Sequence, residues 1–160
     1  MTDRVDPTAV ADLLSQRRLV VVGASRDPRK FGNTIYRSLR DHGYDVTAVN
    51  PAVSEIDGEV CYPHLAAVPG DIDAVIVMVN ESKAADIVRA CIDRGVQRVW
   101  LFKGLGAPGA VSDEALRLCE EHDIVVVPGA CPLMFLEPVG WFHRIHRAAR
   151  HAKGSLAKVS

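Results

Sequence analysis

The chain has 160 residues, of which 48% are hydrophobic and 24% charged, and its formal net charge is −1 at pH 7. These values are ordinary for one soluble domain with a sizeable core, and the near-zero charge gives no indication of a nucleic-acid partner. Its apolar runs are too short to cross a membrane and its first residues lack signal-peptide character, so we expect a cytoplasmic protein without a membrane partner. The 4 cysteines are scattered without a CxxC pair, which argues against a zinc site or a disulfide framework.

Short apolar runs rich in Val and Ile alternate with helical patterns along the chain. The predicted helices are about 7–16, 32–43, 82–94, one that begins at Ser112, and about 138–152. The predicted strands are 19–24, 45–49, 74–79, 98–102 and 124–127. Residues 51–72 are expected to be irregular, with turns at Asp57-Gly58 and Pro69-Gly70. The pattern has no internal repeat or linker, which predicts a single domain over 1–160 with a core of about 10–135.

The strands read as continuous apolar runs, which is typical of strands buried on both faces of a parallel sheet. Right-handed crossovers through the intervening helices then give an α/β fold with one doubly wound, Rossmann-like sheet. We predict five strands in the order 3-2-1-4-5, followed by the C-terminal helix. Ligands of such sheets bind at the carboxyl ends of the strands. The loops expected there are 23–32, 50–53, 80–82 and 103–109.

The segment from Arg18 to Asn33 is the most informative part of the chain. An apolar run ends at Gly23, a small, polar and basic loop follows, and a helical pattern begins after Gly32. A strand that turns through glycine into a helix N-terminus is a common phosphate site, because loop N–H groups and the helix dipole point at the anion. The loop is not a complete GxGxxG motif, since only Gly23 fits, and this departure disfavours an ordinary NAD enzyme.

The residues around this loop indicate a ligand with an additional phosphate on its ribose. NAD-binding proteins place Asp or Glu at the end of the second strand, where it binds the ribose, but Asn50-Pro51 stands here. The first loop also carries Arg26, Arg29 and Lys30, more positive charge than one pyrophosphate requires. Coenzyme A and NADP both satisfy these conditions. The alternative is that Arg29 and Lys30 are solvated loop residues.

Seven short motifs follow one another along the chain: Val22-Gly-Ala-Ser25, Gly32-Asn33, Val49-Asn-Pro51, Tyr62-Pro-His-Leu65, Ile72-Asp-Ala-Val-Ile76, Val99-Trp-Leu101 and Val127-Pro-Gly-Ala-Cys-Pro132. In these motifs the chain resembles the stand-alone CoA-binding family, a single Rossmann domain similar to the N-terminal domain of the succinyl-CoA synthetase α subunit. The resemblance covers about residues 10–135. It implies a protein that binds CoA or an acyl-CoA and lacks the phosphohistidine domain of the ligase.

Carried over by position, the resemblance implies contacts from four loops. The first loop would hold the CoA phosphates, Asn50 and Pro51 would line the adenosine end, and the loops after the third and fourth strands would flank the cofactor. The residues implied are Gly23, Ala24, Ser25, Arg26, Gly32, Asn33, Asn50, Pro51, Val79, Asn80, Lys103 and Gly104, to which the charge argument adds Lys30. The family more often has glutamine where Phe102 or Lys103 stands, followed by a shorter loop.

Cys131 follows the fifth predicted strand at the expected ligand edge, where the family also has a cysteine. The functional hypothesis is that its thiol lies near the pantetheine arm and forms a mixed disulfide with CoA. This reactivity requires a thiol pKa lowered by a cation or a helix N-terminus. The alternative is a small buried hydrophobic residue.

The sequence has no nucleophile–base–acid set, no Walker lysine and no separate substrate domain, which favours a binding protein over an enzyme. Its role would then be that of a carrier, a sensor or a thiol-protecting module. One alternative is an NAD(P)-binding oxidoreductase or regulatory domain. Another is an interaction subunit with a vestigial nucleotide site that acts through the basic helix at 138–152.

His143 and His146 lack a third ligand for a metal. The apolar segment 133–136 either packs on the core or forms a contact in a homo-oligomer.

Overall fold

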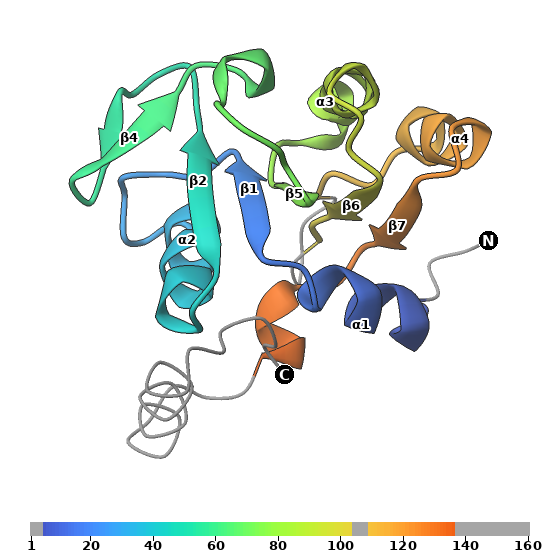
Figure 1. Ribbon diagram of the computed structural model, residues 1–160, viewed down its shortest axis with the longest axis horizontal. Helices are drawn as coiled ribbons and strands as arrows, with labels where there is room; N and C mark the ends of the chain where they lie inside the picture. Colours follow the sequence, from blue (N-terminus) through green and yellow to red (C-terminus); the bar gives the residue numbers. More distant parts are fainter. Residues whose placement is uncertain (1–4, 104–108, 137–160) are drawn as a thin grey trace.

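The computed structural model describes residues 5–103 and 109–136 (Figure 1). Its helices are α1 (Pro7–Leu14), α2 (Phe31–Asp41), α3 (Glu81–Asp93) and α4 (Asp113–Glu121), with 3-10 turns η1 (Leu65–Ala67) and η2 (Pro132–Phe135). Its strands are β1 (Arg18–Val22), β2 (Asp45–Val49), β3 (Glu55–Ile56), β4 (Glu59–Tyr62), β5 (Ala74–Val77), β6 (Arg98–Leu101) and β7 (Val125–Pro128). Gly104 and the predicted helix at 138–152, including His143 and His146, lie outside the described residues.

The strands form one sheet in the order β3-β4-β2-β1-β5-β6-β7, parallel except for the antiparallel pair β3 and β4. Figure 1 shows α1 and α2 on one side of the sheet and α3 and α4 on the other. Leu19 and Val21 of β1 pack into the core under α1 and α2, whereas Val20 and Val22 pack into the core under α3 and α4. This alternation of a wholly apolar strand between two covered faces confirms the predicted doubly wound α/β fold.

The predicted strand count and order are wrong in detail. The third predicted strand, β5, pairs with β1 through Val20 and Val75, so the five predicted strands lie in the order 2-1-3-4-5. All four residues of β5 are buried, which suits the centre of the sheet. The place beyond β2 belongs to β4, and the two-residue β3, which pairs with Glu59 and Val60 of β4, forms the edge of the sheet.

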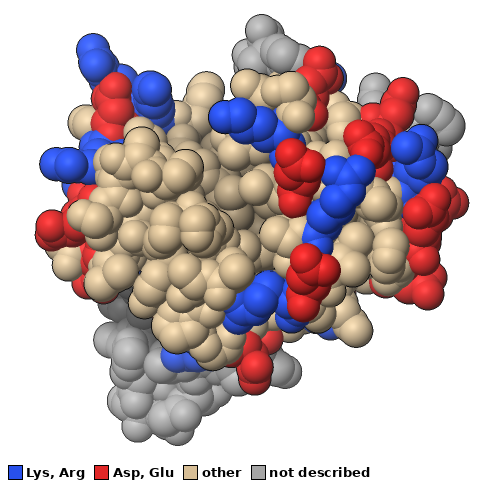
Figure 2. Space-filling view, turned by 90° about the horizontal axis from the view of Figure 1, so that it is seen from above, with Lys and Arg blue, Asp and Glu red and all other residues tan. Residues whose placement is uncertain are grey.

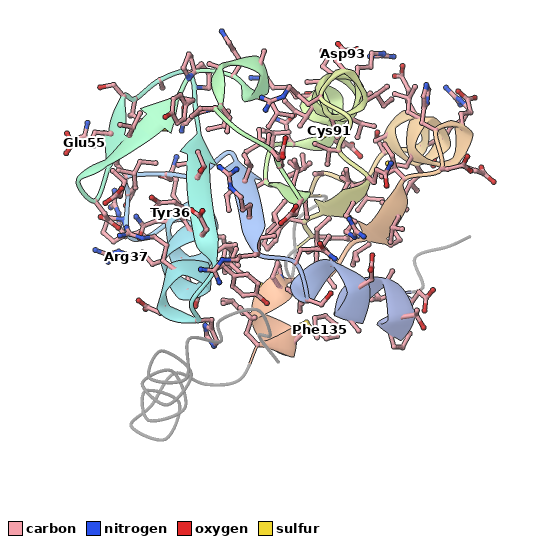
Figure 3. The ribbon with its side chains drawn as sticks, viewed as in Figure 1. Tyr36, Arg37, Glu55, Cys91, Asp93 and Phe135 are labelled. Atoms are coloured by element: carbon pink, nitrogen blue, oxygen red, sulfur yellow. The ribbon has the colours of Figure 1, made fainter. Side chains whose placement is uncertain are left out.

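A hairpin that the sequence prediction missed occupies part of the segment 51–72. Asp57 and Gly58 connect β3 to β4 with φ angles of 52° and 81°, and two left-handed residues are the requirement of a type I′ hairpin turn. Arg37 of α2 forms an ion pair with Asp57, with 2.8 Å between Nε and Oδ2, and Figure 3 shows Arg37 on the side of α2 nearest the hairpin. The ion pair thus joins the turn to the helix.

Two predicted helix starts are confirmed by their capping contacts. The Asp6 side chain accepts a hydrogen bond from the Thr8 N–H at 2.9 Å, and Pro7 occupies the first helical position of α1. The Ser112 hydroxyl accepts a hydrogen bond from the Ala115 N–H at 3.1 Å at the start of α4. Among the described helices, none combines the length and apolar character that a bilayer crossing needs.

Candidate functional site

A cleft of about 440 Å³ lies at the carboxyl ends of β1, β2, β5 and β6. Helix α2 leaves β1 toward one face of the sheet and α3 leaves β5 toward the other, so the loops after these neighbouring strands diverge and open the cleft between them. Doubly wound sheets bind their ligands at such a point. The lining residues are Gly23, Ser25, Lys30, Phe31, Gly32, Asn50, Met78, Val79, Asn80, Phe102 and Gly109.

Two glycines allow the first loop to pass close to its neighbours. Gly23 has a φ of 97°, and a Cβ there would lie 2.7 Å from the Met78 carbonyl oxygen. Gly32, in the first turn of α2, faces the loop so closely that a Cβ would lie 2.4 Å from the Gly23 carbonyl oxygen. Any larger residue at either position would displace backbone, so the cleft wall depends on both glycines.

The N-terminus of α2 presents N–H donors to the cleft. Its cap residue, Lys30, makes no side-chain hydrogen bond to the helix. Within residues 5–103 and 109–136, the N–H groups of Ser25, Phe31 and Gly32 have no acceptor. Together with the positive end of the helix dipole, these donors suit an anion such as a phosphate group.

Two amide side chains brace the loop from behind. Asn33 is only 2% exposed, and its Nδ2 donates to the Ser25 carbonyl oxygen at 2.8 Å. Asn50, at the end of β2, donates from Nδ2 to the Ala24 carbonyl oxygen at 2.7 Å, and its Oδ1 accepts from the Ala52 N–H. Asn33 therefore shapes the site without lining it, whereas Asn50 does both.

The loop carries less free positive charge than its composition suggests. Arg29 forms an ion pair with Asp27, with 3.0 Å between Nε and Oδ1. The hydrogen bond from Arg29 also holds the pKa of the Asp27 carboxyl below its usual value. Among the described residues, Arg26 and Lys30 form no ion pair with a carboxylate, and Lys30 lines the cleft. Two of the three expected cations thus remain available to an anion.

The other end of the cleft is apolar. Phe31 and Phe102 contact each other there, with ring centroids 5.8 Å apart and planes inclined by 43°. Met78 and Val79, which follow β5, complete this wall. Phe31, Met78 and Phe102 were not predicted from the sequence as lining residues. Their position next to Gly32, Val79 and Lys103, which were predicted, is the signal that identifies them in retrospect.

Gly109 belongs to the loop 103–109 expected at the ligand edge, but it was not predicted as a contact residue. Its φ is 68°, and a Cβ there would lie 2.4 Å from the Phe102 carbonyl oxygen. The next residue, Ala110, donates its N–H to the same oxygen at 2.8 Å. The chain therefore folds back against the end of β6, and this turn closes the cleft beside Phe102.

The structure brings half of the expected contact residues together in the cleft: Gly23, Ser25, Lys30, Gly32, Asn50, Val79 and Asn80. Ala24 and Asn33 lie buried behind the loop. Arg26, Pro51 and Lys103 are exposed outside the cleft lining. Gly104 lies outside the described residues.

Cys131 is not among the described residues that line the cleft. It is the cap residue of η2, and its side chain packs against the core beneath α1 and α2. Burial raises the pKa of the Cys131 thiol, an effect that the Leu133 backbone N–H only partly opposes. Burial also raises the pKa values of Cys91 and Cys119 to about 12. A thiol with a raised pKa is a poor nucleophile near neutral pH, so the described residues around Cys131 do not activate its thiol, and the mixed disulfide with CoA stays a prediction.

Elsewhere on the described surface the charges are mixed. A more open hollow of about 700 Å³ is lined by Arg37, Arg40, Asp41 and Asp57, which include an ion pair. On the face in Figure 2, positive and negative side chains alternate over the side of α3 and α4, so this face has no extended area of one sign. In the part of the chain that the structure describes, His, Cys, Asp and Glu form no cluster of three that could hold a metal.

Comparison with known proteins gives a consistent result. A family model described as a CoA binding domain matches residues 17–137. The acetate–CoA ligase (ADP-forming) I of Archaeoglobus fulgidus is 31% identical over 147 residues, which are 89% of this chain and 21% of the ligase. An uncharacterised protein of Bacillus subtilis is 25% identical over 74% of this chain and 84% of its own length. The chain thus spans about a fifth of the ligase but most of the smaller relative.

Solved structures show the same likeness. A hypothetical protein from Pyrococcus horikoshii has a TM-score of 0.73 and 28% identity, with 84% of this chain and 89% of that chain covered. An acetyl-coenzyme A synthetase of Candidatus Korarchaeum cryptofilum has a TM-score of 0.62 and 29% identity, with 73% of this chain but 27% of that chain covered.

Proposed function

This chain belongs to the CoA-binding domain family, and from that premise we propose that it binds coenzyme A or an acyl-CoA in the cleft at the carboxyl ends of β1 and β5. The observation that carries the proposal is that N–H groups at the start of α2, which have no acceptor among the described residues, lie beside Lys30, which has no carboxylate partner among them, at the point where the sheet's helices diverge. An N–H cradle with a cation beside it suits the diphosphate of the cofactor.

The end of β2 supports a ligand with a phosphorylated ribose. Asn50 stands where a carboxylate would repel that phosphate. Its amide group donates to the Ala24 carbonyl oxygen and accepts from the Ala52 N–H. Arg26, exposed on the same loop, is available to a phosphate outside the cleft. NADP meets the same charge requirement, but the family match and the relatives favour CoA.

We propose a binding role without catalysis: a carrier, a sensor or a protector of the CoA thiol. Among the described residues that line the cleft, Lys30 is the only titratable side chain, so this part of the lining offers no acid–base pair. The chain corresponds to about a fifth of the acetate–CoA ligase it resembles. A contribution to ligase chemistry would therefore require the remaining parts of such an enzyme. A cytoplasmic location and a homo-oligomeric state stay predictions.

Thermal unfolding with CoA, acetyl-CoA, NAD and NADP side by side tests the proposal. A ligand at a hundredfold its dissociation constant stabilises the folded state by about 2.7 kcal/mol. For a chain of this size this corresponds to a rise in Tm of roughly 5–10 °C. We expect CoA and acetyl-CoA to produce this rise. A rise with NADP but not with CoA would refute the proposal and favour an NADP-binding domain, whereas no rise with any ligand would favour an interaction subunit with a vestigial site.

A further inference from the structure

The cleft has two chemically different ends, separated along the edge of the sheet. Asn50 follows β2, Gly23 follows β1, Met78 and Val79 follow β5, and Phe102 follows β6, and these strands are consecutive neighbours. Neighbouring strands lie about 4.8 Å apart, so the three gaps between β2 and β6 span about 14 Å. The N–H groups of Ser25, Phe31 and Gly32 lie at the end of β1. On one side of them the cleft has a polar end, the polar arm, toward Asn50, and on the other side it has an apolar end, the apolar arm, toward Phe102.

Phe31 is the unusual side chain of the apolar arm. It is 56% exposed, although it follows directly on Lys30 and opens α2 beside the anion cradle. Phe102 beneath it is 8% exposed and supports the Phe31 ring from below. An apolar ring held against a buried aromatic partner presents a ready-made surface for an apolar group of the ligand, because covering it removes apolar area from water.

We infer that this wall receives the pantetheine and acyl end of the ligand, and that Phe31 is the residue that selects for apolar acyl groups. The inference rests on the proposed function, which supplies the cofactor. The adenosine and its ribose phosphate then lie over the polar arm, toward Asn50. Met78, Val79 and Phe102 offer the pantetheine arm apolar side chains, and the exposed ring of Phe31 covers the acyl group beyond it. The protein would then bind CoA thioesters with apolar acyl groups more tightly than free CoA.

The alternative occupant of the wall is the adenine ring, which also stacks on aromatic side chains. Adenosine 3′,5′-bisphosphate distinguishes the two, because it carries the adenine and the ribose phosphate but neither pantetheine nor acyl group. Calorimetric titration of this compound, CoA and butyryl-CoA against the unaltered protein, Phe31→Ala and Phe31→Leu measures the contribution of each ligand part. Met134→Ala is the matched control, because Met134 is 74% exposed and lies outside the cleft.

We expect the unaltered protein to bind butyryl-CoA about tenfold more tightly than CoA, through burial of the butyryl chain. Phe31→Ala should remove this preference and leave the affinity for adenosine 3′,5′-bisphosphate within twofold, while Phe31→Leu should keep most of the preference and Met134→Ala all of it. An equal loss of all three ligands in Phe31→Ala would place the adenine on the wall and overturn the inference, as would an unchanged preference. Failure of the unaltered protein to bind either CoA compound would instead refute the proposed function itself.

Discussion

Replacement of Gly32 by alanine should separate the binding function of this chain from its stability. The new Cβ would lie 2.4 Å from the Gly23 carbonyl oxygen and 3.3 Å from the Ser25 nitrogen. Both contacts are with backbone, which cannot yield by rotating a side chain. Either the loop or the first turn of α2 must move away, and the N–H groups of Ser25, Phe31 and Gly32 then no longer converge.

The expected effects on stability and on binding differ in size. Overpacking of this kind costs about 1–3 kcal/mol, and the better helix propensity of alanine offsets up to about 1 kcal/mol of it. The net loss of about 0–3 kcal/mol lowers the Tm by no more than roughly 12 °C. Two misplaced hydrogen bonds to a charged phosphate, at about 1.5–3 kcal/mol each, weaken CoA binding by about 10² to 10⁴-fold.

Isothermal titration with CoA, together with thermal unfolding, measures both quantities on the same protein. Ser38→Ala is the control, because Ser38 lies in α2 but outside the cleft lining. The control should bind CoA like the unaltered protein. If Gly32→Ala folds and binds CoA within threefold of the unaltered protein, the close approach of helix and loop does not form the phosphate site.

Three further predictions concern the loop and the cysteines. Arg26→Ala should weaken binding of CoA more than that of dephospho-CoA in calorimetric titration, because Arg26 is exposed outside the cleft lining and available to the ribose phosphate. Asn33→Ala should destabilise the protein by about 1–3 kcal/mol in urea unfolding, because it leaves the Ser25 carbonyl oxygen without its buried donor. Cys131 should react with iodoacetamide at pH 8 more slowly than a free cysteine and Cys91 more slowly still, since burial raises both thiol pKa values, that of Cys91 to about 12.

Each of these predictions has a specific contrary result. Equal losses of CoA and dephospho-CoA in Arg26→Ala would assign the arginine to the diphosphate, and Arg117→Ala, an exposed cation on α4, controls for net charge. An Asn33→Ala protein as stable as the unaltered one would show that the loop does not need its brace. Mass spectrometry that finds rapid alkylation of Cys131, or a mixed disulfide with oxidised CoA that Cys131→Ser removes, would reinstate the reactive-thiol hypothesis.

Much of the fold follows from local patterns, but strand order does not. Apolar runs such as Leu19–Val22 indicate buried parallel strands, because a strand covered on both faces of the sheet has apolar side chains at every position. Pairing between strands distant in sequence is not encoded in that periodicity. The four buried residues of β5 nevertheless favour a central place, and Asp57-Gly58 is a recognised hairpin signal. Both signals were present in the sequence, and the prediction used the second only as a turn.

The site was predictable where the backbone alone determines it. Gly23 and Gly32 mark a strand, a loop and a helix start, and these segments do form the cleft wall. Side-chain partners were harder to predict. Arg29 was counted as a free cation, although Asp27 two residues earlier neutralises it. Cys131 follows the ligand edge in sequence, and the sequence did not show that it caps η2 with a partly buried side chain packed against the core.

A crystal structure of the protein with CoA would show whether the N-terminus of α2 holds the cofactor. We expect the diphosphate over this N-terminus, with phosphate oxygens within about 3 Å of the N–H nitrogens of Ser25 and Gly32. Lys30 should lie beside the phosphates. Cofactor bound at another part of the surface, or a diphosphate away from these N–H groups, would contradict the proposed site.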